Sequence, residues 1–209
     1  MRAMIFSAQE FEHRHRRIRA EMKDRGLDAL ILTRGENIFY GSGFKASHFA
    51  SWLCELHALV IPAAGEPRIM TRSLEREAAA IQFTQSPKLY MDHENAYEVL
   101  LGILNESGTT TGVIGIEERH LKLSQFKKLQ SALPNARFVD VTGLVEGLAA
   151  TPSPAESDCL RRSARVTQIG LEAGLRAARV GVYPYEVIGA VHQAMYAAGQ
   201  RDFDIALVA

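Results

Sequence analysis

Hydrophobic and polar positions along the first 150 residues alternate between helical and strand-like periods. Phe11, Ile18 and Met22 recur at helical spacing, whereas residues 28–33 form a compact apolar run that is typical of a buried strand. The same two patterns predict helices over 8–25, 73–82, 95–106, 121–133 and 142–149, and strands over 28–33, 38–40, 53–62, 67–71, 88–91, 112–116 and 136–141. This alternation indicates an α/β domain, and a hairpin turn at 63–66 makes its sheet mixed.

A second domain is predicted from residue 151, so the chain divides into 1–150 and 151–209. Pro152 and Pro154 interrupt the preceding pattern, and Ser153 with Glu156 forms a capping-box pair for a helix that runs to about residue 179. A second helix follows over 184–198, and 203–209 reads as the start of a strand. Two helices and one strand cannot bury a core alone, so we expect the chain to be a piece of a larger protein. The apolar seam of the first helix is predicted to consist of Leu160, Ala164, Thr167, Leu171 and Leu175.

The charge balance and the cysteine content indicate which partners and which cellular compartment to expect. Lys+Arg and Asp+Glu number 24 each, and this balance argues against a nucleic-acid partner or an anionic membrane surface. The basic cluster at 13–17 is expected to be a solvated helix face. Cys54 and Cys159 fall in different predicted domains, and no signal peptide or membrane-length apolar run is present, so we expect a cytoplasmic protein.

No catalytic motif is complete in the sequence. The row 92–94 (Asp-His-Glu) has three metal-ligand types, but adjacent residues of an extended segment point to opposite faces, so a polar strand end is the preferred interpretation. Glu117 and Glu118 could serve acid–base chemistry, yet we expect them to begin a solvated loop. His57 is expected on the solvent side of its strand, opposite Leu56 and Ala58.

The segment 44–52 is the strongest candidate for binding. It follows a Gly-Ser-Gly break and combines a cation, an imidazole, two hydroxyls and three aromatic rings within nine residues. The alternative is a loop that packs its aromatic rings beneath itself. We identify Phe44, Lys45, His48 and Trp52 as the candidate substrate-binding residues.

A set of residues that extends in order over nearly the whole chain follows one known pattern: Arg14, Met22, the run 26–32, Asn37, Tyr40, Gly43, Phe44, the run 153–156, Leu160, Arg161, Ala164, Gly181, Val182, Glu186, Val187, Ala194, Met195 and Gly199. Together these segments resemble the creatinase/prolidase group of metallohydrolases, whose catalytic domain has the pita-bread fold. Two departures stand out: Pro152 replaces a lysine that is common in the family, and the family's metal ligands (two Asp, one His and two Glu) have no counterpart within these 209 residues.

The resemblance implies a ribonuclease H-like α/β domain over 1–150 and the first helices of a pita-bread α+β domain over 151–209. It implies an Xaa-Pro dipeptidase-like enzyme that acts on a peptide or small-molecule amide with two divalent metal ions (Mn, Co or Zn). This chain alone would be inactive and bind no metal, and it has no catalytic residue. The family also implies a homodimer in which 44–52 reaches the partner's active site: Lys45 or His48 would pair with a substrate carboxylate, and Phe44 and Trp52 would pack on a proline ring.

Three alternatives remain open. A creatinase-like C–N hydrolase is the nearest, since the same segment could bind a guanidino-carboxylate. If the natural chain ends at Ala209, a non-catalytic binding module is favoured. An unrelated α/β small-molecule binder would require the second part to leave no exposed apolar helix face.

Overall fold

The computed structural model describes residues 5–46, 55–81 and 83–200. The chain separates into two compact units, Met1–Thr151 and Pro152–Ala209. His48, Trp52 and Cys54 lie outside the described residues.

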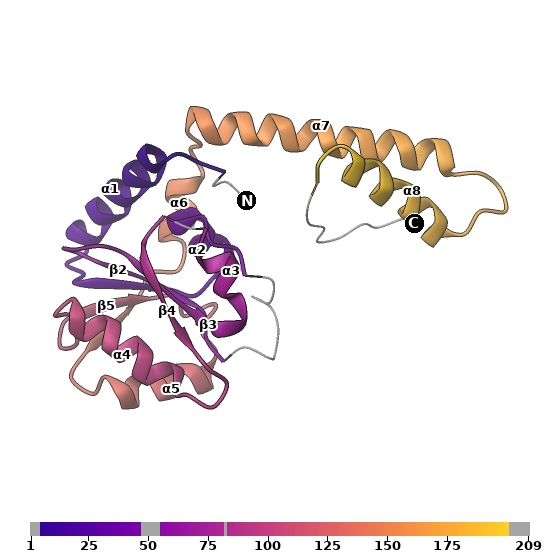
Figure 1. Ribbon diagram of the computed structural model, residues 1–209. Helices are drawn as coiled ribbons and strands as arrows, with labels where there is room; N and C mark the ends of the chain where they lie inside the picture. Colours follow the sequence, from indigo (N-terminus) through magenta and orange to yellow (C-terminus); the bar gives the residue numbers. More distant parts are fainter. Residues whose placement is uncertain (1–4, 47–54, 82, 201–209) are drawn as a thin grey trace. The chain divides into compact units, whose positions relative to one another are not determined.

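The first unit is built on a six-stranded mixed sheet with the strand order β4-β3-β2-β1-β5-β6 (Figure 1). β2 pairs antiparallel with both β1 and β3, whereas the remaining pairs β3/β4, β1/β5 and β5/β6 are parallel. The predicted mixed α/β sheet and its central hairpin are therefore confirmed. The strands are β1 (Ala29–Leu32), β2 (Ala58–Pro62), β3 (Arg68–Arg72), β4 (Gln85–Tyr90), β5 (Val113–Ile116) and β6 (Arg137–Asp140).

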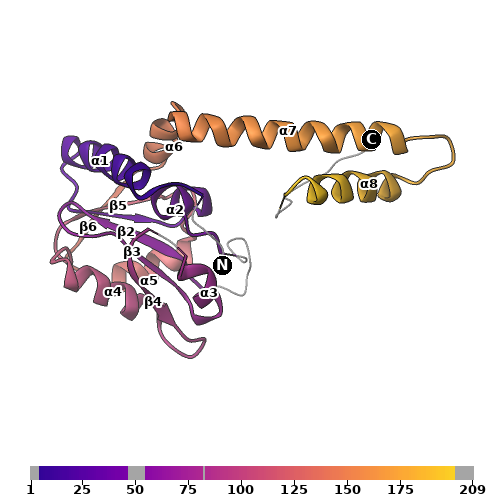
Figure 2. The same cartoon turned by 45° about the horizontal axis from the view of Figure 1, so that its top comes forward.

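Helices cover both faces of this sheet (Figures 1 and 2). Successive residues of a strand point to opposite faces, so Leu30 and Leu32 join one core while Ala29 and Ile31 join the other. The first core lies under α1, α2, α3 and α6, and the second under α4 and α5. The helices are α1 (Ala8–Asp24), α2 (Gly35–Ser42), α3 (Arg76–Ala79), α4 (Ala96–Glu106), α5 (Leu123–Ala132) and α6 (Leu144–Ala149), with a 3-10 turn η1 (Ser73–Glu75) before α3.

The predicted strand over 38–40 is wrong, because these residues lie within helix α2. A short apolar run fits either structure, and here contacts with distant parts of the chain decide. Gly41 lets α2 lie close against β2: a Cβ at this position would be 2.6 Å from Leu59 Cδ2. Gly43 then ends the helix with φ 74°, and its N–H donates to the Phe39 carbonyl oxygen at 2.7 Å.

In the part of the second unit that the structure describes, residues 152–200, the chain forms two helices, α7 (Pro154–Ala177) and α8 (Pro184–Ala197). The predicted capping box is confirmed: the Glu156 N–H donates to the Ser153 hydroxyl at 3.1 Å, and the Ser153 N–H donates to the Glu156 carboxylate at 2.8 Å. Across the described ranges, no helix has both the length and the apolar character needed to cross a bilayer.

The predicted apolar seam of α7 is not the face that contacts α8. Leu160, Leu171 and Leu175 are 60–68% exposed. α8 instead packs on Gly170 and Gly174, since a residue without a side chain allows the closest approach. The pattern of apolar side chains along the sequence does not reveal this contact face, because glycine has no side chain.

Candidate functional site

The start of the predicted binding segment is fixed on the body of the domain. The Ser42 hydroxyl donates to the Ile38 carbonyl oxygen at 2.6 Å and accepts from the Phe44 N–H at 3.1 Å. Phe44 and Ala46 are buried, at 0% and 3% exposed, whereas Lys45 between them is exposed. Of the two candidate residues that the structure describes, Lys45 has an exposed side chain, while Phe44 anchors the segment in the core.

The residues that follow the undescribed stretch 47–54 are anchored as well. The Tyr90 hydroxyl accepts from the Leu56 N–H at 3.1 Å and donates to the Leu56 carbonyl oxygen at 2.8 Å. The Glu55 carboxylate accepts from the Tyr97 hydroxyl at 2.9 Å and from the Lys128 ammonium at 2.7 Å. The hydrogen bond from Lys128 lowers the pKa of Glu55, and burial together with the bond to Glu55 raises the pKa of Tyr97.

His57 is buried, so its predicted place on the solvent side is wrong. It is 6% exposed, and its Nδ1 lies 2.7 Å from the Thr71 hydroxyl on β3. The Phe44 ring meets the imidazole edge-on with the ring centroids 6.5 Å apart. The strand alternation was correct, but the entry to the binding segment covers the face that we expected to be open.

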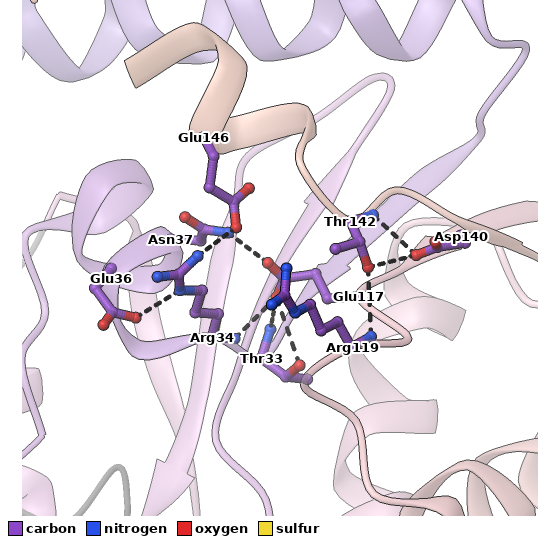
Figure 3. Close-up of polar contacts among 9 residues, drawn as sticks. All are labelled: Thr33, Arg34, Glu36, Asn37, Glu117, Arg119, Asp140, Thr142 and Glu146. Carbon is purple, nitrogen blue, oxygen red and sulfur yellow. Dashed lines mark hydrogen bonds and ion pairs between the residues drawn. The ribbon is translucent and has the colours of Figure 1, made fainter. Parts of the chain in front are cut away.

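Glu117, directly after β5, is a buried carboxylate and does not begin a solvated loop. It is 2% exposed and accepts from the N–H groups of Thr33 at 2.5 Å and Arg34 at 2.8 Å. Its other oxygen accepts from the Asn37 side-chain amide at 2.5 Å (Figure 3). These donors belong to the N-terminus of α2, where unsatisfied N–H groups and the helix dipole favour a negative charge. Glu118, the neighbouring residue, is exposed as predicted.

Further polar contacts surround Glu117 at the carboxyl edge of the parallel strands (Figure 3). The Arg34 guanidinium forms ion pairs with Glu146 at 2.6 Å and with Glu36 at 2.9 Å. Asp140, which ends β6, accepts from the Thr142 hydroxyl at 2.6 Å and from the Thr142 N–H at 2.9 Å. These hydrogen bonds from Thr142 lower the pKa of Asp140. The carboxylates of the cluster are thus engaged with donors of the same domain.

Two residues of the basic cluster on α1 hold the other end of α2, so the expectation of a fully solvated face is wrong. Arg14 is 1% exposed; its guanidinium donates to the Tyr40 carbonyl oxygen at 2.9 Å and lies 4.1 Å from the centre of the Phe6 ring. The Nε2 atom of His15 lies 2.6 Å from the Gly41 carbonyl oxygen. Burial lowers the pKa of His15 from its ordinary value.

The residues that the structure describes do not fit a two-metal centre. Within 5–46, 55–81 and 83–200, no three His, Cys, Asp or Glu side chains gather so that they could hold a metal ion. In the row 92–94, Asp92 forms an ion pair with Arg72, and the Glu94 carboxylate accepts from the Met91 N–H at 2.6 Å. This row is a polar turn between β4 and α4.

Comparison with known families agrees with this architecture. A model of the creatinase/prolidase N-terminal domain matches residues 14–148, and the chain belongs to this family. Among its relatives are a creatinase from Bacillus sp. (strain B-0618), 33% identical over 187 residues, and a putative dipeptidase from Bacillus subtilis (strain 168), 24% identical over 180 residues. The fold is similar to that of an Xaa-Pro dipeptidase from Bacillus anthracis, with a TM-score of 0.72 at 20% identity.

The chain spans about half the length of these relatives. The alignments cover 87% of this chain and 44% of the creatinase, and 86% of this chain and 48% of the putative dipeptidase. The structural match covers 90% of this chain and 50% of the Xaa-Pro dipeptidase.

Proposed function

We propose that this chain is the N-terminal part of a metal-dependent hydrolase that cleaves a C–N bond. The observation that carries the proposal is the family match over 14–148, together with alignments to a creatinase and a putative dipeptidase that extend over nearly the whole chain. Residues 1–150 would form the N-terminal domain, and 151–209 the first helices of the catalytic domain. The enzyme would be cytoplasmic.

Two divalent metal ions would supply a polarised water for attack on the carbon of the scissile C–N bond, and residues outside this chain would hold them. We propose that the present chain contributes substrate access and dimerisation. Its binding segment would reach the active site of a second copy, where Lys45, His48 and Trp52 would contact the substrate. Lys45 suits a substrate carboxylate, because an ammonium group forms strong charge-assisted hydrogen bonds with that anion.

An Xaa-Pro dipeptide is the first candidate substrate, supported by the relative named a putative dipeptidase. Creatine is the second candidate, favoured by the 33% identity to a creatinase. Both molecules end in a carboxylate that Lys45 could bind. Assaying the full-length enzyme on each substrate separates the two. Hydrolysis of neither, by a protein loaded with Mn²⁺, Co²⁺ or Zn²⁺, would favour the non-catalytic binding module.

The role of the segment is tested with Lys45→Ala and Trp52→Ala in the full-length enzyme. We expect KM to rise about ten-fold for Lys45→Ala, the loss typical of one charge-assisted contact, while metal content stays unchanged. Lys127→Ala, which removes an exposed lysine on α5, is the matched control. An unchanged KM for both segment variants would remove the segment from the site. The 209-residue chain alone is expected to hydrolyse neither substrate and to bind no stoichiometric divalent ion.

A further inference from the structure

Helix α2 is held at both ends by buried charged side chains from other elements. Glu117 accepts from the N–H groups of Thr33 and Arg34 at its start, and Arg14 donates to the Tyr40 carbonyl oxygen near its end. The helix dipole favours a negative charge at the N-terminus and a positive charge at the C-terminus. Glu117 supplies the negative charge at the start of α2, and Arg14 supplies the positive charge near its end. With Glu117 at 2% and Arg14 at 1% exposure, water does not replace either contact.

Close packing restricts sideways movement of the same helix. A Cβ at Gly41 would lie 2.6 Å from Leu59 Cδ2, and a Cβ at Gly43 would lie 2.9 Å from the Phe11 ring. α2 has only eight residues, so a shift at its first turn is transmitted to its last. The chain leaves this helix through the buried Phe44, and the exposed Lys45 comes next.

We propose that Glu117 is a positioning residue for substrate binding: by fixing the start of α2, it fixes the direction in which Lys45 meets the substrate. The inference rests on the proposed function, in which Lys45 contacts the substrate. Glu117 is itself too buried to touch a ligand and acts through the helix. Its exposed neighbour Glu118 has no such role.

The test is Glu117→Gln in the full-length enzyme. Glutamine keeps the shape of the side chain but removes the negative charge and turns an amide group toward the amide of Asn37. We expect KM to rise about five- to ten-fold, with kcat changed by no more than about two-fold and metal content unchanged, since the change affects substrate orientation. Glu118→Gln is the matched control and should leave both constants at the wild-type values. A wild-type KM for Glu117→Gln would overturn the proposal.

A double variant separates positioning from a general structural effect. If Glu117 acts through Lys45, the KM of Lys45→Ala/Glu117→Gln equals that of Lys45→Ala alone. If the rise in KM of the double variant instead equals the product of the two single rises, Glu117 does not act through Lys45. If Lys45→Ala by itself leaves KM unchanged, Lys45 does not contact the substrate, and a second measurement then decides whether Glu117 fixes the helix.

That second measurement is hydrogen exchange of the 209-residue chain, which needs no activity. Glu117→Gln should accelerate amide exchange over 35–46 and leave exchange in α7 at the wild-type rate. Glu118→Gln should accelerate neither. Wild-type exchange over 35–46 in the Glu117→Gln chain would show that Glu117 does not fix the helix.

Discussion

The Nε2 atom of His15 lies 2.6 Å from the carbonyl oxygen of Gly41, so a histidine of α1 holds the last turn of α2. Burial lowers the pKa of this imidazole below its ordinary value of about 6.5. As the pH falls below about 6.5, the unfolded chain takes up a proton before the folded chain does. The free energy of unfolding therefore decreases on acidification through this range, whereas the contribution of His15 is complete above it.

We expect His15→Gln to flatten that pH dependence, because glutamine can still donate to the Gly41 carbonyl but does not titrate. The measurement is urea unfolding of the 209-residue chain at several pH values between about 5 and 8. His13→Gln removes an exposed histidine of the same helix and should retain the wild-type slope. Equal slopes for His15→Gln and the wild type would show that His15 is not the group responsible.

Tyr90 should be a stabilising residue at the end of the binding segment. Its buried hydroxyl serves both the N–H and the carbonyl oxygen of Leu56. Tyr90→Phe leaves these two backbone groups without that partner, and we expect the free energy of unfolding to fall by about 1–3 kcal/mol. Tyr196→Phe, at a tyrosine that is 51% exposed, is the control and should change stability by less than about 0.5 kcal/mol. If both variants unfold at the same urea concentration, the Leu56 contact contributes nothing.

The contact between α7 and α8 depends on a glycine. A Cβ at Gly174 would lie 2.9 Å from Val191 Cγ2, and valine has little freedom to move aside in a helix. Gly174→Ala should destabilise the helix pair by about 1–2 kcal/mol, despite the better helix propensity of alanine. Gly189→Ala meets no atom within 4 Å and should stabilise the pair by up to about 1 kcal/mol. Hydrogen exchange of α8 measures both effects, and a slower exchange in Gly174→Ala would contradict the packing described.

Much of the first unit could be predicted from the sequence, since β1, β2 and β5 are short apolar runs and the longer helices are clearly amphipathic. The predicted face of Phe11, Ile18 and Met22 on α1 is fully buried. The failure at 38–40 has a physical reason. This run is too short for a period to be recognised, and the groups that stabilise it as a helix, Glu117 and Arg14, are distant in the sequence.

The candidate site was less predictable for the same reason. A pair of carboxylates after a strand looks solvated from the sequence, and nothing local indicates that Glu117 would meet three N–H groups from 33–37. Similarly, strand alternation placed His57 on the correct face but could not show that Phe44 would cover it. The Gly-Ser-Gly break did indicate where an element ends, since α2 stops at Gly43, two residues before the exposed Lys45.

The contact between Asn37 and Glu117 provides a direct test of the buried charge. The Asn37 amide nitrogen lies 2.5 Å from the Glu117 carboxylate, and both residues are buried. Asn37→Asp would bring two carboxylates together, so one of them must retain a proton in the folded state and its pKa must rise. Stability is then lost as the pH rises: the variant should be close to wild type near pH 4 and about 3 kcal/mol less stable at pH 7. Adding Glu117→Gln again gives one carboxylate and one amide, now with the carboxylate at position 37 and the amide at position 117. Most of the stability lost at pH 7 should therefore be recovered. A deficit that is equal at both pH values, or one that the second substitution leaves in place, would mean that Glu117 does not hold the negative charge at the start of α2.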